Sequence, residues 1–237
     1  KLWDREQSLI TAMQQQRCNT RYLPQIQFSA KLEPIIALND AMANADIALI
    51  AIPSIGFRHL LAKISNYNKP IVWATKGIEP QGNQLLHTVI AEILGVNIKS
   101  AILSGPSFAK EVALGLPTAV VIASNDKVYA ESLIALFANP YFRPYYSDDV
   151  IGVAIGGAVK NVMAIAAGIS DGLGFGANAR VALITRGLNE ITQLAVALGA
   201  RTETLMGLSG LGDLILTCTD DQSRNRRFGL ALGKGLT

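Results

Sequence analysis

Short, wholly apolar runs alternate with helix-like stretches through the first part of the chain. Runs without interspersed polar residues are typical of strands buried on both faces of a parallel sheet, with crossover helices covering it. Because ligands bind outside the carboxyl ends of such strands, we expect functional residues in the polar turns that follow them. Five runs predict strands: residues 47–52, 71–74, 100–103, 118–123 and 142–146.

After residue 147 the strand pattern stops and long helical patterns take its place. A helix that starts at Ser147-Asp148-Asp149 is predicted to extend to about residue 169, and it is apolar on nearly every face except at Lys160 and Asn161. A second helix, capped by Asn178, is predicted over residues 178–198, because apolar side chains recur there every three to four positions. The change of pattern predicts a domain boundary near residue 147, with the functional site in the cleft between the domains.

Composition narrows the class of protein. Hydrophobic residues make up 50% of the 237 and charged residues only 16%, which is too little charge for a disordered tail or a coiled coil. The mean hydropathy is +0.30. No apolar run, however, reaches the roughly 18–20 residues of a membrane-spanning helix, so we expect a soluble chain without a membrane span. Cys18 and Cys218 form no CxxC pair and favour reduced thiols, hence a cytoplasmic location.

Lys160 is the most informative single residue. It stands in the middle of an apolar helix, flanked by Gly156, Gly157 and Ala164, small residues that leave room for a ligand against the helix. Partial burial disfavours the charged form of a lysine and lowers its pKa toward the range useful for proton transfer. The alternative interpretation is a lysine whose long side chain only snorkels to the surface.

Two further charged features lie in the second half. Asp213 follows a Gly-rich turn and either caps a helix start or pairs with Lys160. The basic cluster over residues 222–229 fits nucleic-acid contact, recognition of a small phosphate, or a solvated loop. The net charge of only +3 favours the small phosphate over nucleic acid, so no nucleic-acid partner is expected.

Polar turns follow two of the predicted strands. Lys76 ends the second strand, and Gly105 and Ser107 follow the third, where a glycine permits close approach to the backbone. These donors suit an anionic substrate or cofactor. His59 and His87 fall in separate helical stretches and are interpreted as helix-surface residues, so we expect no metal site. Lysine is then the default proton donor or acceptor.

Several strings taken together resemble the bacterial NAD(P)-dependent glycerol-3-phosphate dehydrogenases, over essentially the whole chain. The strings include Trp73-Ala74-Thr75-Lys76-Gly77, Ser104-Gly105-Pro106-Ser107-Phe108-Ala109, Gly156-Gly157-Ala158-Val159-Lys160-Asn161, Leu211-Gly212-Asp213-Leu214 and Ser223-Arg224-Asn225-Arg226-Arg227-Phe228-Gly229.

The resemblance implies both a fold and an activity. The fold is a Rossmann-like parallel sheet domain over residues 1–147, followed over residues 148–237 by an all-α domain like the C-terminal domain of 6-phosphogluconate dehydrogenase. The activity is reversible hydride transfer between NAD(P)H and dihydroxyacetone phosphate, which supplies sn-glycerol 3-phosphate for phospholipid synthesis. The family is commonly dimeric, so a homodimer is expected.

The resemblance also implies roles for individual residues. Lys160 stands at the position of the general acid/base and Asp213 at that of a second active-site carboxylate. The implied substrate-binding residues are Lys76, Gly105, Ser107, Asn161, Thr217, Ser223, Arg224 and Asn225. The implied cofactor-binding residues are Arg5, Pro53, Lys76, Ala109 and Arg224.

The cofactor follows from the residues around the second strand of the family's fold. Arg5 matches a position near the adenosine ribose and can pair with a 2′-phosphate, which favours NADPH, whereas Asp4 beside it suits the ribose hydroxyls of NADH. Either cofactor is expected, with a lean to NADPH. The family's first strand and Gly-rich turn precede this sequence and further helices follow it, so we expect the 237 residues alone to bind the dinucleotide poorly.

Other hypotheses remain at this stage. One is another two-domain hydroxy-acid or sugar-phosphate dehydrogenase, such as an enzyme of the 6-phosphogluconate type. A second is a truncated, inactive fragment. A third is a non-catalytic nucleic-acid role for residues 222–229, which would show steeply salt-dependent binding.

Overall fold

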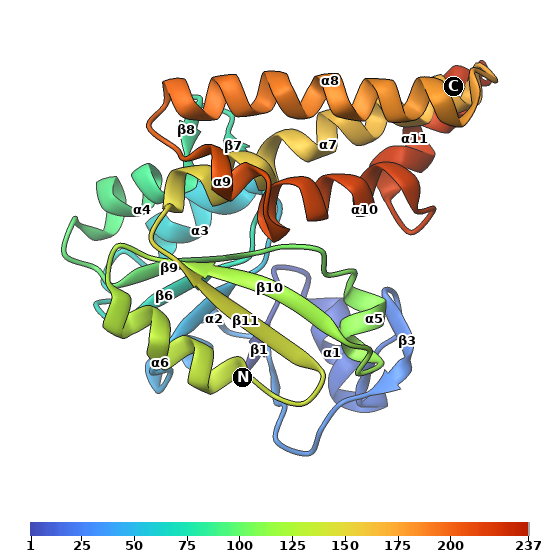
Figure 1. Cartoon of the computed structure of the whole chain (residues 1–237). Coiled ribbons are helices and arrows are strands. Elements are labelled where there is room, and N and C mark those ends of the chain that lie inside the picture. The colour runs from blue at the N-terminus through green and yellow to red at the C-terminus, as the bar shows by residue number, and fades with distance from the viewer. Residues whose placement is uncertain (237) are drawn as a thin grey trace.

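A five-stranded sheet lies at the centre of the first part of the chain in the computed structural model, which describes residues 1–236 (Figure 1). Its strand order is β11-β10-β9-β6-β5. All five predicted strands are present, with bounds close to those expected. The strands are β5 (Ala48–Ile50), β6 (Ile71–Trp73), β9 (Ser100–Ser104), β10 (Thr118–Ala123) and β11 (Phe142–Ser147).

Most neighbouring strands of this sheet run parallel, as predicted. The pairs β5–β6, β6–β9 and β10–β11 are parallel, whereas β9 and β10 are antiparallel. Between β9 and β10 the chain forms only the short helix α5 (Ala109–Ala113). It therefore turns back beside β9 instead of crossing over the sheet, as a parallel connection requires.

Helices cover both faces of the sheet, which is why its strands are apolar throughout. One face packs against α3 (Phe57–Lys63) and α4 (Leu86–Leu94), and the other against α6 (Lys127–Phe137). Alternate side chains of β6 enter the two cores: Ile71 and Trp73 lie on the α3 and α4 side, and Val72 lies on the α6 side.

The remaining elements of this sheet layer are short. The chain starts with β1 (Leu2–Trp3), which pairs in parallel with β4 (Pro34–Ile35) in a separate two-stranded sheet. The others are α1 (Gln7–Gln16), β2 (Cys18–Asn19), β3 (Leu23–Gln27), α2 (Leu38–Ala43), the 3₁₀ turn η1 (Ser54–Gly56), β7 (Ile78–Glu79) and β8 (Gln84–Leu85).

The second part of the chain is a helical layer stacked over one end of the sheet (Figure 1). Asp149 caps its first helix, as predicted, by accepting a hydrogen bond from the Gly152 amide at 2.8 Å. The prediction for the second helix was wrong at its start, because glycines at 174 and 176 with positive φ complete the turn and Asn178 lies inside the helix. The elements are α7 (Val150–Gly172), α8 (Gly176–Ala197), α9 (Thr202–Leu205), the π-helical turn η2 (Leu208–Gly212), α10 (Asp213–Thr219) and α11 (Arg224–Gly233).

Helix α7 joins the two layers. Val153 and Ala154 near its start belong to the sheet core, whereas Ala164 and Ala167 belong to the helical core. By length and composition α7 could cross a membrane, but 56% of its most apolar stretch is buried inside the protein. Its hydropathy is thus explained by contacts with both layers.

Helices α7 and α11 approach each other closely enough for backbone to touch backbone. A Cβ atom on Gly172 would lie 2.6 Å from the Leu230 carbonyl oxygen, and one on Gly233 would lie 2.5 Å from that of Ile169. Gly168 and Gly229 leave still less space, against the carbonyl oxygens of Arg226 and Ile165. Glycine at these positions fixes α11 along the second half of α7.

Candidate active site

Two lysines from different layers meet on one buried carboxylate. Lys160 Nζ donates to Asp213 Oδ1 at 2.5 Å, and Lys76 Nζ donates to Asp213 Oδ2 at 2.7 Å. Asp213 is 1% exposed and Lys160 is 8% exposed, so Lys160 does not snorkel to the surface. Of the two interpretations of Asp213, pairing with Lys160 is correct, because its carboxylate binds lysines and caps no helix.

The electrostatics of this cluster favour a lysine that exchanges a proton near neutral pH. Burial, followed by the positive charge of Lys76, lowers the pKa of Lys160 from 10.5 to about 8, while Asp213 acts in the opposite direction. With all three groups ionised the cluster carries one net positive charge. It is therefore suited to an anionic substrate or to developing negative charge.

Three elements place these side chains. Lys76 follows β6 at its carboxyl end, and its Nζ also donates to the Gly105 carbonyl oxygen at 3.1 Å, after the end of β9. Lys160 projects from the middle of α7, and Asp213 begins α10 after the π-helical turn η2. The carboxyl ends of β6 and β9 thus face the helical layer, as the strand-end turns predicted.

Gly156 and Gly157 near Lys160 do not leave the space for a ligand that was predicted, but allow other segments of the protein to pack against α7. A Cβ on Gly156 would lie 2.5 Å from the Ser209 carbonyl oxygen, so η2 packs against the helix there. A Cβ on Gly157 would lie 3.2 Å from Ser104 Oγ and 3.5 Å from Lys76 Cγ. These glycines let protein, not ligand, approach α7, and the predicted room for a ligand beside them was wrong.

Ser104 stands in the strand-end string quoted above, but the sequence analysis assigned it no individual role. Its hydroxyl lies beside Gly157, is completely buried and has no hydrogen-bond partner among the described residues. No signal in the sequence separates it from any other serine at a strand end.

The turn after β9 presents the other predicted strand-end residues. Ser107 Oγ donates to the Gly105 carbonyl oxygen at 3.0 Å, the same oxygen that Lys76 contacts. Gly105 has a φ of 142°, and a Cβ there would lie 3.0 Å from Val120 Cα. Ala109 is exposed at the start of α5.

Asn161 and Thr217 are neighbours of the buried charges along their helices, Asn161 of Lys160 on α7 and Thr217 of Asp213 on α10. Asn161 follows Lys160 on α7 and is half-buried. Thr217 is buried one turn along α10 and donates its hydroxyl hydrogen bond to the Asp213 carbonyl oxygen at 2.6 Å. The structure thus brings Lys76, Gly105, Ser107, Lys160 and Asp213 together, with Thr217 one turn further along α10.

The basic cluster over residues 222–229 is the start of a helix and not a solvated loop. Ser223 Oγ caps α11 by accepting from the Arg226 amide at 3.2 Å. Arg224 is exposed and Asn225 half-buried in the first turn, whereas Arg226 is buried among acidic partners. The arginines therefore do not form one continuous basic surface.

Arg5 follows β1, and Pro53 follows β5, the strand that pairs in parallel with the strand before Lys76. Both are exposed. The Arg5 guanidinium makes no ion pair with any residue from 1 to 236, while Asp4 Oδ1 accepts from the Glu6 amide at 2.8 Å.

The histidines and cysteines do not contribute to this cluster. His59 is exposed on α3, but His87 on α4 is partly buried, and desolvation lowers its pKa, so the prediction of a surface residue was wrong for His87. Cys18 and Cys218 are both free and buried, which confirms the predicted thiols. Within residues 1–236 no cluster of three histidine, cysteine or acidic side chains could hold a metal ion.

Family models match nearly all of the chain. The model described as the NAD-dependent glycerol-3-phosphate dehydrogenase N-terminus matches residues 1–130, and the corresponding C-terminus model matches residues 149–237. The chain belongs to the NAD-dependent glycerol-3-phosphate dehydrogenase family. The sequence resemblance is thereby confirmed.

Individual relatives agree with this family. The chain is 58% identical to "Glycerol-3-phosphate dehydrogenase [NAD(P)+]" of Thioalkalivibrio sulfidiphilus, over 99% of this chain and 72% of that protein. It is 55% identical to the protein of the same name from Nitrosococcus oceani, over 99% of this chain and 69% of the relative. The crystal structure of glycerol-3-phosphate dehydrogenase from Coxiella burnetii superposes with a TM-score of 0.97 at 47% identity, covering 99% of this chain and 73% of that one.

Proposed function

We propose that this chain catalyses reversible hydride transfer between NAD(P)H and dihydroxyacetone phosphate, giving sn-glycerol 3-phosphate, with Lys160 as the general acid/base. Family membership supports the reaction, and this role of Lys160 rests on one observation. A buried lysine with a pKa near 8 shares a carboxylate with a second lysine at the carboxyl edge of the sheet.

Lys160 performs the proton transfer in this proposal. When bound, the nicotinamide cofactor supplies the hydride that reaches C2 of the substrate. The Lys160 ammonium gives its proton to the C2 oxygen as negative charge develops there, and the neutral amine takes a proton from the C2 hydroxyl in the reverse direction. A pKa of about 8 leaves both forms accessible near neutral pH.

Lys76 and Asp213 prepare Lys160 for this step. Asp213 fixes the ammonium group in one direction through the 2.5 Å hydrogen bond, while the charge of Lys76 lowers the pKa of Lys160. Lys76 keeps a second hydrogen bond to the Gly105 carbonyl oxygen and so stands between the substrate turn and the catalytic carboxylate. Removal of Asp213 would leave two ammonium groups facing each other without a counter-ion.

The substrate phosphate is assigned to the start of α11. Ser223, Arg224 and Asn225 occupy the cap and first turn, where backbone amides and the helix dipole favour an anion. The exposed Arg224 adds a planar guanidinium that suits phosphate oxygens. Gly105, Ser107, Asn161 and Thr217 complete the proposed substrate contacts.

The residues present fit a dinucleotide at the carboxyl ends of β1, β5 and β6. Arg5, Pro53, Lys76, Ala109 and Arg224 are proposed to hold it. Arg5 is exposed and unpaired within residues 1–236, as a partner for a 2′-phosphate must be, and this supports the lean to NADPH. Asp4 Oδ1 accepts a backbone hydrogen bond and Oδ2 stays available, so NADH is retained as the second cofactor.

Three broader expectations belong to the same proposal. The boundary between the cofactor and substrate domains is placed at residue 147, where β11 ends shortly before α7 begins. A homodimer in the cytoplasm is proposed from the family resemblance. Light scattering of the purified protein tests the dimer.

The decisive experiment follows NADPH loss by absorbance after addition of dihydroxyacetone phosphate to the full-length enzyme. Lys160→Met should lower kcat by roughly 10²–10⁴-fold while leaving the dissociation constant for NADPH nearly unchanged. Lys127→Met is the matched control, because Lys127 is an exposed lysine on α6 that pairs with the exposed Glu131 one turn along the same helix, away from the cluster. Retained turnover in Lys160→Met would refute the acid/base role. A panel of phosphorylated sugars and hydroxy acids, assayed with the unsubstituted enzyme, distinguishes the proposed activity from that of related two-domain dehydrogenases.

Arg224→Ala tests the phosphate site separately. The substitution should raise the KM for dihydroxyacetone phosphate by roughly tenfold or more, because it removes a charged contact to the substrate. An unchanged KM would contradict the phosphate assignment.

A further inference from the structure

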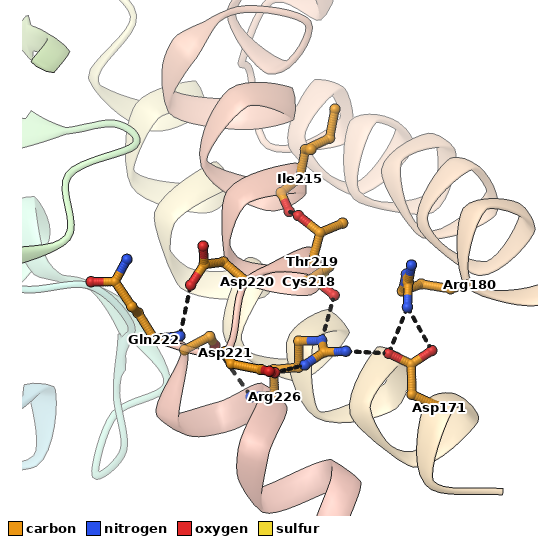
Figure 2. Close-up of polar contacts among 10 residues, drawn as sticks. Asp171, Arg180, Ile215, Cys218, Thr219, Asp220, Asp221, Gln222 and Arg226 are labelled. Carbon is orange, nitrogen blue, oxygen red and sulfur yellow. Dashed lines mark hydrogen bonds and ion pairs between the residues drawn. The ribbon is translucent and has the colours of Figure 1, made fainter. Parts of the chain in front are cut away.

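Arg226 is a buried arginine that the proposed mechanism does not use. It is the third residue of α11, directly after Arg224 and Asn225, and is 8% exposed. Figure 2 shows its guanidinium surrounded by acceptors from three segments. Nε donates to the Cys218 carbonyl oxygen at 3.1 Å, Nη2 donates to Asp171 Oδ2 at 2.5 Å, and Nη1 pairs with Asp221.

Asp171 connects this arginine to the rest of the helical layer. It lies near the end of α7 and also accepts both hydrogen bonds from Arg180 Nη1 of α8, at 2.9 and 2.8 Å (Figure 2). The carboxylate is only 10% exposed, so both ion pairs are screened little by solvent. Arg226 is therefore held to a carboxylate that is itself fixed.

The same contacts determine where the start of α11 lies. The Cys218 carbonyl is close to the end of α10, Asp221 is in the connection between α10 and α11, and Ser223 caps the Arg226 amide. Behind them, the glycine contacts of α7 with α11 prevent the helix from sliding. The backbone of Arg224 and Asn225, just before Arg226, is therefore held in place.

We propose that Arg226 is a positioning residue for the substrate-phosphate site, holding the backbone of Arg224 and Asn225 through Asp171, Asp221 and the Cys218 carbonyl. It touches no substrate itself. Asp171 is the anchor, and Asp221, which is 78% exposed, adds a weaker restraint. This inference rests on the proposed function, because it presumes that Arg224 and Asn225 bind the phosphate.

The geometry demands a guanidinium. Its three contacts leave from three different nitrogens in one plane and reach three separate segments. A lysine ammonium carries the same charge on a single atom and cannot span these acceptors together. Arg226→Lys therefore preserves charge and removes the planar connection.

The test compares two substrates that share the reacting carbonyl and differ in the phosphate. With the full chain and saturating NADPH, Arg226→Lys should lower kcat/KM for dihydroxyacetone phosphate by at least roughly tenfold, mainly through KM. For dihydroxyacetone, which has no phosphate, kcat/KM should stay within about twofold of the unsubstituted enzyme. Asp171→Asn should show the same pattern.

Arg227→Lys is the matched control, because Arg227 is the exposed neighbour and its side chain pairs with no residue of the described 1–236. It should alter neither substrate. An unchanged KM for dihydroxyacetone phosphate in Arg226→Lys would overturn the inference, and so would an equal loss with both substrates, which would mean a general structural role.

Asp221→Asn provides a second test of the inference, because an exposed side chain can be changed with little effect on folding. Asp221→Asn changes an exposed carboxylate and should raise the KM for dihydroxyacetone phosphate by about threefold. If Arg226→Lys fails to fold, the absence of any KM change in Asp221→Asn overturns the inference. An unsubstituted enzyme that does not turn over dihydroxyacetone phosphate would instead refute the proposed function.

Discussion

Lys160 experiences two opposing electrostatic influences from neighbours on different elements. Burial in α7 and the charge of Lys76 both favour the neutral amine, whereas Asp213 favours the ammonium ion. The balance is a pKa of about 8 instead of 10.5. Both the protonated and the neutral form of Lys160 are therefore populated near neutral pH, as the proposed acid/base role requires in the two directions of the reaction.

This balance predicts that kcat/KM depends on pH with opposite sign in the reduction and the oxidation direction. Reduction requires the protonated form of Lys160, so kcat/KM should fall as the pH rises through about 8. Oxidation of glycerol 3-phosphate requires the neutral amine, so kcat/KM should rise up to the same pH and then level off. Steady-state rates between about pH 6 and pH 10 test this, and limbs of the same sign in both directions would contradict it.

Asp213→Asn should change the position of these limbs. The carboxylate is the group that raises the pKa of Lys160, so its loss lets burial and Lys76 lower that pKa further. The reduction limb should therefore move to lower pH in the remaining activity. A limb that stays in place, measured with the same assay, would show that Asp213 does not set the charge of Lys160.

The sequence revealed these residues unequally. Lys160 stood out because one lysine interrupts an otherwise apolar helix, and Asp213 because it follows a Gly-rich turn. Arg226 did not, since its partner Asp171 is far away in the chain and nothing in a single sequence pairs them. A charged residue within an apolar segment can be recognised from its sequence neighbours. An ion pair between residues far apart in the chain cannot, because it depends on the fold.

At the scale of elements, the contact between α7 and α11 fixes the position of the first turn of α11, where the phosphate site is proposed. Glycines at 168 and 172 of α7 face those at 229 and 233 of α11, so the two backbones pack without intervening side chains. A helix held by its backbone has little freedom to shift by a fraction of an ångström. The first turn of α11 is thereby as rigid as α7.

Gly229→Ala should disrupt this packing. The new methyl group would collide with the Ile165 carbonyl oxygen, a backbone atom that cannot move aside, and we expect a loss of about 3 kcal/mol or more in the free energy of unfolding. Gly56→Ala is the control, because its methyl group would lie 3.6 Å from Ile52 Cδ1 in ordinary contact. Urea denaturation compares the two, and equal stabilities would contradict the close approach.

Element positions were predictable where the apolar period was unambiguous. The five strands and α7 emerged from their uninterrupted apolar runs, and Asp149 marked the start of α7. The antiparallel direction of β10 did not emerge, because strand direction depends on whether the connection crosses the sheet. The start of α8 was misplaced because glycine conformation outweighed the capping preference of Asn178.

At the scale of the whole molecule, α7 belongs to two cores at once. Its first turns belong to the hydrophobic core that α3 and α4 form with the sheet. Its later turns belong to the core of the helical layer. The layers therefore share one continuous hydrogen-bonded helix. Opening either core exposes part of α7, so the two layers are expected to unfold as one unit.

Amide hydrogen exchange tests this coupling. The central amides of α7 should exchange only through global unfolding and yield one common free energy, whereas the exposed segment around Tyr22 should exchange far faster. Distinct free energies for the first and second halves of α7 would show that the layers open independently.

The hydrogen bond between Lys76 and Asp213 has a consequence for the order of folding. Its donor follows β6 in the sheet layer and its acceptor begins α10 in the helical layer. Neither half of the chain alone contains the complete charge cluster, however well it folds by itself. Catalysis therefore reports complete folding: because both layers share α7, turnover on dilution from denaturant should return together with the helical circular dichroism signal and not before it.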